Sequence, residues 1–116
     1  MRLIPPEPGT LPLAAAVAAA RLQSLTPGWR VEERKGVLRL CKEYPTPDFQ
    51  QAMALASCVA DLAATANHHP VLEIGWGRLS VQWWTHSLRG LHGNDFLMAA
   101  ACDGVIADFM QNSGAQ

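Results

Sequence analysis

The amino-acid sequence predicts an α+β domain in which three helices pack on one face of a four-stranded antiparallel sheet, in the order α-β-β-α-β-β-α. Three observations lead to this prediction. Alanine is concentrated in three separate stretches, two stretches of strand-forming residues each contain a glycine turn, and the two kinds of segment alternate along the chain. Strands joined by tight turns pair antiparallel, and amphipathic helices then need one face of the sheet to cover their apolar sides.

The first helix is predicted over residues 11–24, where alanines surround a sparse apolar row. Thr10 can cap this helix, and Pro12 is tolerated in its first turn because an N–H there has no helical partner. The run Thr26-Pro27-Gly28 ends the helix. Ahead of it, the proline-rich residues 1–9 predict a disordered arm.

The first hairpin is predicted from strands at residues 29–33 and 37–41, because Gly36 supplies the positive φ that a tight turn needs. A second helix is predicted over residues 47–66. Its start is Thr46-Pro47-Asp48, which combines a capping residue, a proline suited to the first turn and an acidic side chain at the positive end of the helix dipole. Apolar side chains then recur at steps of three or four, the spacing of an amphipathic helix.

The second hairpin joins strands predicted at residues 71–76 and 78–85 through the turn Gly75-Trp76-Gly77. Asn67 can end the helix before it. Apolar and polar residues alternate along the latter strand, so one face of the sheet meets the helices and the other faces water or a partner. A last helix is predicted over residues 95–110.

Length, charge and cysteine content limit the classes of function. The 116 residues suit one domain, which we place at residues 10–112, and a hydrophobic fraction of 49% is enough for a core. A net charge of −1 argues against a nucleic-acid partner, since phosphate neutralisation by Lys and Arg dominates that binding. No apolar run reaches the roughly 20 residues that span a bilayer, so no membrane association is expected. Three widely spaced cysteines favour a reducing, cytoplasmic location over a disulfide framework.

Four histidines fall within 25 consecutive residues, and Asp95 follows them at the start of the last helix; they are His68, His69, His86 and His92. Imidazoles titrate near neutral pH, so two of them with a carboxylate suit proton transfer. Surface histidines without a role are the alternative. A metal site is disfavoured because His68 and His69 are adjacent and point opposite ways in an extended segment. A cysteine nucleophile is disfavoured because the helical cysteines lie on apolar faces.

The order and spacing of these residues form a longer pattern. It reads His68-His69-Pro70, five residues, Trp76, nine residues, His86, eight residues and Asp95. This pattern is similar to the signature of the pterin-4a-carbinolamine dehydratase family. The resemblance covers about residues 13–110 and extends to Gly28-Trp29, Phe49, Thr85-His86, Gly90-Leu91 and Asp95-Phe96.

The resemblance implies the three-helix, four-stranded α+β fold, with sheets joined across a homodimer and sometimes a tetramer. It implies dehydration of a 4a-hydroxytetrahydropterin, such as 4a-hydroxytetrahydrobiopterin, to the quinonoid dihydropterin, which recycles the pterin used by aromatic amino acid hydroxylases. The pterin is then the substrate, and neither a metal nor another cofactor is implied. The residues that the resemblance assigns to catalysis are His68, His69, His86 and Asp95, and those assigned to substrate binding are Trp29, Phe49 and Trp76.

Two positions depart from the pattern of the family. An acidic residue usually stands four positions before the first histidine, where this chain has Ala64. A Ser or Thr usually stands three positions before the helix-opening aspartate, where this chain has His92. We therefore expect Asn94 to cap the last helix.

The family also includes members without the enzymatic activity, which gives an alternative expectation. One bacterial branch, the pterin dehydratase-like proteins of α-carboxysome operons, assists RuBisCO assembly, and some animal members act in transcriptional coactivation. The Trp83–His86 run and residues 90–96 look like the RuBisCO branch. The two expectations are a cytoplasmic bacterial dehydratase acting on a pterin, and a catalytically silent assembly factor, or chaperone, that binds the RuBisCO large subunit.

Overall fold

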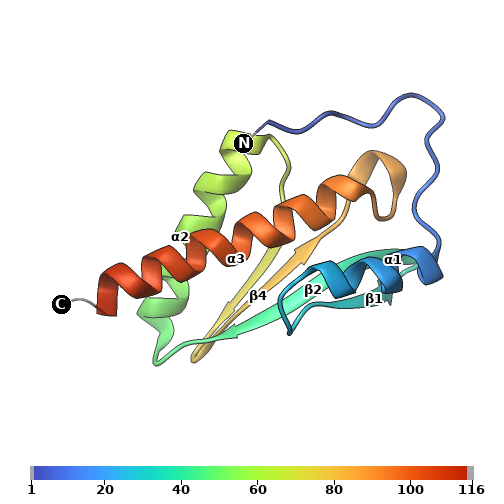
Figure 1. Cartoon of the computed structure of the whole chain (residues 1–116). Helices are drawn as coiled ribbons and strands as arrows, with labels where there is room; N and C mark the ends of the chain where they lie inside the picture. The colour runs from blue at the N-terminus through green and yellow to red at the C-terminus, as the bar shows by residue number, and fades with distance from the viewer. Residues whose placement is uncertain (1, 115–116) are drawn as a thin grey trace.

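The computed structural model describes residues 2–114 and confirms the predicted order of helices and strands (Figure 1). The strands form one antiparallel sheet in the order β1-β2-β4-β3, and the helices lie on one side of it, which confirms the α+β fold class. With η marking a short 3-10 helix, the elements are α1 (Ala15–Arg21), η1 (Leu22–Ser24), β1 (Arg30–Arg34), β2 (Val37–Pro45), α2 (Phe49–Ala66), β3 (Val71–Gly75), β4 (Arg78–Trp83), η2 (His86–Leu88) and α3 (Gly93–Gly114).

The hydrophobic core lies between the sheet and the helices. Leu40 on β2 is paired with Trp83 on β4, and both side chains are fully buried. Val59 of α2 and Cys102 of α3 belong to the same buried cluster. Burying one side chain of the size of leucine or valine stabilises the fold by about 1.5–3 kcal/mol, so this layer fixes the helices against the sheet.

Both ends of α2 are fixed by local interactions. Asp48 caps its start, since a carboxylate oxygen accepts a hydrogen bond from the Gln51 backbone N–H at 2.8 Å. The predicted start at Pro47 is two residues early, because Asp48 and not Thr46 is the cap. Asn67 ends the helix in the left-handed conformation, with a φ of 51°, which confirms its predicted role.

Helix α1 is shorter than predicted. It begins at Ala15 and has no side-chain cap. Thr10, the predicted cap, instead donates its hydroxyl to the backbone oxygen of Glu7 at 2.7 Å. The backbone N–H of Leu13 donates to the backbone oxygen of Leu91 at 2.8 Å. A backbone contact from a distant segment thus competes with the local signals for helix formation, and the helix starts later.

The arm ahead of α1 runs back past the start of α3 toward the end of α2 (Figure 1). Leu3 packs against the hydrophobic core, and the backbone oxygen of Ile4 accepts a hydrogen bond from the Asn94 side chain at 2.8 Å. These contacts hold residues 2–6 beside the site described below. The disorder predicted for residues 1–9 stays a prediction, as do the domain limits.

None of the helices within residues 2–114 is long and apolar enough to cross a membrane. The three cysteines are free. Burial raises the pKa of the Cys102 thiol to about 11, which keeps this side chain protonated and unreactive at neutral pH.

Candidate active site

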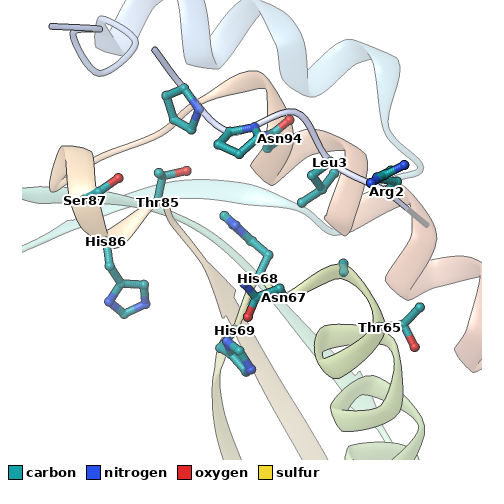
Figure 2. A pocket seen from close by; sticks show the side chains of 13 residues that line it. Arg2, Leu3, Thr65, Asn67, His68, His69, Thr85, His86, Ser87 and Asn94 are labelled. Atoms are coloured by element: carbon teal, nitrogen blue, oxygen red, sulfur yellow. The ribbon is translucent and has the colours of Figure 1, made fainter. Parts of the chain in front are cut away.

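A cleft of about 720 Å³ lies where the arm, the end of α2, η2 and the start of α3 meet. Its volume is in the range of small-molecule sites. Figure 2 shows His68, His69 and His86 around this cleft, with Arg2 and Leu3 of the arm above them in this view. The remaining lining residues are Pro5, Pro6, Thr65, Ala66, Asn67, Thr85, Ser87 and Asn94.

His68 is held more firmly than the other two histidines. Its Nε2 atom lies 2.7 Å from Asp95 Oδ1, and its ring stacks on Trp83 with the planes 20° apart and the centroids 6.0 Å apart. The His68 side chain is 13% exposed, whereas the Asp95 side chain is fully buried. The left-handed turn at Asn67 places His68 just beyond α2, where the buried carboxylate fixes its ring at the wall of the cleft.

Asp95 is in turn fixed by the segment that opens α3. Its second oxygen, Oδ2, accepts hydrogen bonds from the Thr85 hydroxyl at 2.8 Å and from the His92 backbone N–H at 2.9 Å. The His92 ring reciprocates, since its Nδ1 accepts a hydrogen bond from the Asn94 backbone N–H at 3.1 Å. This arrangement resembles a capping box with histidine in the capping position, except that the ring accepts from the second helical residue, Asn94, and not from the third. The prediction that Asn94 caps this helix is therefore wrong, because His92 fills that role.

His69 and His86 reach the cleft from two different connections. Both side chains are exposed and both line the cleft. His86 opens η2, and its ring centroid lies 4.4 Å from that of Trp84. Three imidazoles beside one cleft, one of them bound to a buried carboxylate, can donate protons to a bound molecule and accept protons from it. Within residues 2–114, no group of three or more His, Cys, Asp or Glu side chains could hold a metal ion.

The three aromatic residues predicted to bind substrate do not line the cleft. Trp29 is buried and donates its Nε1–H to Asp103 Oδ2 at 2.8 Å. Phe49 begins α2, an 18-residue helix about 27 Å long, and the cleft lies at its other end. Trp76 is 77% exposed in the turn between β3 and β4, which lies near the start of α2 (Figure 1). The single chain does not bring them to the histidines, and their role in binding stays a prediction.

A second carboxylate with many hydrogen bonds, Asp103 on α3, is missing from the sequence predictions. Burial acts to raise the pKa of this carboxyl, but hydrogen bonds from neighbouring side chains outweigh burial and lower the pKa. In the sequence, the only feature that sets Asp103 apart is its charge within the otherwise apolar row of the last helix. The donors, at 2.6–2.8 Å from its oxygens, are Lys42, Tyr44, Thr26 and Trp29; with Asp103 they form the Asp103 cluster.

Comparison with known proteins identifies the family of this chain. A sequence profile described as "Pterin 4 alpha carbinolamine dehydratase" matches residues 11–105. The chain belongs to this family. A Chlorobium limicola protein named "Putative pterin-4-alpha-carbinolamine dehydratase" is 44% identical over 105 residues, which are 90% of this chain and 92% of that protein. A protein of the same name from Syntrophotalea carbinolica is 41% identical over 95 residues, or 82% of this chain and 85% of that protein.

Two solved structures share the fold. One is described as a transcriptional coactivator/pterin dehydratase from Brucella melitensis; it has a TM-score of 0.69 and 24% identity, with 82% of this chain and 98% of that chain covered. The other is a pterin dehydratase-like protein identified as a RuBisCO assembly factor in the α-carboxysome. It has a TM-score of 0.56 and 19% identity, with 68% of this chain and 89% of that chain covered. At these identities the likeness shows the fold alone.

Proposed function

We propose that this chain dehydrates a 4a-hydroxytetrahydropterin to the quinonoid dihydropterin in the cleft described above. The observation that carries the proposal is the 2.7 Å contact between His68 and the buried Asp95 at the wall of a cleft that two further histidines also line. Membership of the family and the 44% identity to the Chlorobium limicola protein support the same reaction.

The reaction needs an acid and a base at the same time. The bond between C4a and the hydroxyl oxygen breaks as that oxygen receives a proton and leaves as water. The proton on N5 goes to a base, and the N5–C4a double bond forms. Imidazoles suit both roles because their protonated and neutral forms are both accessible near neutral pH.

Asp95 defines what His68 can do. A carboxylate only accepts hydrogen bonds, so His68 donates from Nε2, and its Nδ1 is left to accept or to deliver a proton. The exposed rings of His69 and His86 supply the second group. Ala64 lies on the exposed side of α2 and outside the lining of the cleft, so the acidic residue missing there removes no member of this arrangement.

The test is an assay of quinonoid dihydropterin formation with the purified chain. We expect a rate above the spontaneous one, and we expect His68→Ala and His86→Ala each to lower it by roughly 10²–10⁴-fold, the usual range for general acid–base groups. Circular dichroism shows whether each variant keeps the fold. A wild-type rate equal to the spontaneous rate would sink the proposal.

The alternative expectation, RuBisCO assembly, stays a prediction. The RuBisCO assembly factor resembles this chain at 19% identity and so supports a shared fold only. Co-expression with RuBisCO subunits, scored by the yield of assembled enzyme, tests this alternative. The assembly role would be favoured if the yield of assembled RuBisCO rises and the chain does not raise the dehydration rate above the spontaneous one. The homodimer or tetramer and the cytoplasmic location also stay predictions.

A further inference from the structure

The end of β4 places two consecutive tryptophans against two different histidines of the cleft. Trp83 belongs to the buried core, and its ring stacks on that of His68. Trp84 follows it and is half-buried, and its ring centroid lies 4.4 Å from that of His86, with the planes 31° apart. Each tryptophan thus contacts one histidine that lines the cleft.

The two histidines differ in what else holds them. His68 has the hydrogen bond to Asp95 in addition to its stacking contact. His86 is exposed, and the contact that its ring makes with a described residue is the one with Trp84. An exposed side chain samples several rotamers unless a contact selects one, so the Trp84 ring is the group that can fix the orientation of His86.

Trp84 is itself anchored from the open face of the sheet. The guanidinium carbon of Arg39 lies 4.1 Å from the centre of the indole, within the range of a cation–π contact. Arg39 donates from Nη1 to Gln82 Oε1 at 3.1 Å, and Gln82 donates from Nε2 to Glu73 Oε1 at 3.0 Å. Gln82 is only 2% exposed. This chain of contacts links β3, β4 and β2 to the indole.

We propose that Trp84, anchored by Arg39, is a positioning residue that orients the His86 ring for proton transfer. The inference rests on the proposed dehydratase function, because it assigns the stack a role in that reaction. A reacting group displaced by about 1 Å can lose roughly 10²-fold in rate, so a contact that fixes an exposed imidazole affects kcat more than KM. Trp84 acts through His86 and needs no contact with the pterin.

The kinetic test is a double-mutant cycle. We expect Trp84→Ala to lower kcat by roughly 10- to 100-fold with little change in KM, and Trp84→Phe, which keeps an aromatic face, to restore most of kcat. Arg39→Met should lower kcat by less. Its matched control is Arg78→Met. Arg78 lies on the same sheet face at the far end of β4 from Trp84, where it donates to the Ser80 hydroxyl at 2.9 Å, so this variant should leave kcat unchanged. In the His86→Ala background, Trp84→Ala should have no further effect.

The structural test needs no activity. The ring current of the indole displaces the NMR signals of the His86 ring protons, which the His86→Ala variant identifies. We expect Trp84→Ala to move these signals toward the values of a free histidine, and Arg39→Met to move them partway, while Arg78→Met leaves them in place. Where Trp84→Ala fails to fold, Trp84→Phe and Arg39→Met still give both readouts.

The outcomes separate the two proposals. Two results would overturn the positioning role and leave the dehydratase function intact. One is that the effects of Trp84→Ala and His86→Ala on kcat multiply in the double variant. The other is that the His86 NMR signals do not respond to Trp84→Ala or Arg39→Met. A wild-type rate equal to the spontaneous rate would reject the dehydratase function and with it a catalytic role for the stack, even if the NMR signals show the contact.

Discussion

Helix α3 carries two carboxylates that are both saturated with hydrogen bonds, Asp95 in its first turn and Asp103 about two turns later. Asp95 is fully buried, and Asp103 has a side-chain exposure of 16%. Each accepts bonds on both of its oxygens. The donors to Asp95 are the His68 ring, the Thr85 hydroxyl and the His92 backbone. The donors to Asp103 are Lys42, Tyr44, Thr26 and Trp29.

The two carboxylates differ in what their partners can exchange. Three of the donors to Asp103 are hydroxyl or indole groups, and burial raises the pKa of the Tyr44 hydroxyl well above its usual range. Asp95 instead binds an imidazole, the side chain that most often serves as a general acid or base, and the His68 ring also lines the cleft. A buried, saturated carboxylate is therefore not by itself evidence of a catalytic site. The chemical type of its partners and their access to a cleft distinguish a structural carboxylate from a candidate catalytic pair.

The largest expected effect is the loss of activity in Asp95→Asn. The amide has the shape of the carboxylate but lacks its charge, so it no longer stabilises a protonated His68. We expect the dehydratase rate to fall by roughly 10²–10⁴-fold, as for loss of a general acid–base group. The matched control is Asp61→Asn, an exposed aspartate of α2, which should keep the wild-type rate. Equal rates in the two variants would contradict the role given to Asp95.

The opposite result is expected for Asp103→Asn, which should lose stability and keep activity. Removing the charge weakens the bond to Lys42 and leaves some of the other donors without an acceptor. Breaking a largely buried pair costs about 2–4 kcal/mol of the free energy of unfolding. Urea unfolding measures this cost against Asp108→Asn, an exposed aspartate of the same helix. If the dehydratase rate of Asp103→Asn per folded molecule were as low as that of Asp95→Asn, Asp103 would not be a purely structural carboxylate.

The same variant has a signature in its pH dependence. Hydrogen bonds within the Asp103 cluster outweigh burial and lower the pKa of Asp103 in the folded chain. As the pH falls, Asp103 is therefore protonated in the unfolded chain before it is protonated in the folded chain. The stabilising contribution is complete above the ordinary aspartate pKa of about 3.9 and is lost as the pH falls through the lower folded value. Wild type should therefore lose stability below about pH 4 more steeply than Asp103→Asn.

The comparison also explains what the sequence can predict. The fold class and the order of elements follow from local features, such as the Thr46-Pro47-Asp48 start of α2, the Asn67 helix end and the glycine turns. The predicted start of α1 is wrong because the backbone hydrogen bond from Leu13 to Leu91 joins segments far apart in the chain. Secondary structure is predictable where neighbours in sequence determine it, and not where the tertiary fold does.

The same limit applies to the two carboxylates. The histidines and Asp95 lie within 28 consecutive residues. The structure brings three of the histidines to one cleft and places Asp95 against His68, although their roles stay predictions. The partners of Asp103 begin at Thr26, 77 positions away, and no local pattern connects them. Arg2 and Leu3 line the cleft for a similar reason, because the arm folds back onto a segment distant in sequence.

The smallest expected effect concerns His92, which caps the helix that carries both carboxylates. His92→Ala removes the Nδ1 acceptor of the Asn94 N–H but keeps the backbone N–H that donates to Asp95. We expect a loss of about 1 kcal/mol in the free energy of unfolding, the usual value of a capping side chain. His92→Ser, which restores a good cap, should recover it. Activity should change little, because Asp95 keeps its contacts with His68 and Thr85; a loss as large as that of Asp95→Asn would mean that the cap holds the pair in place.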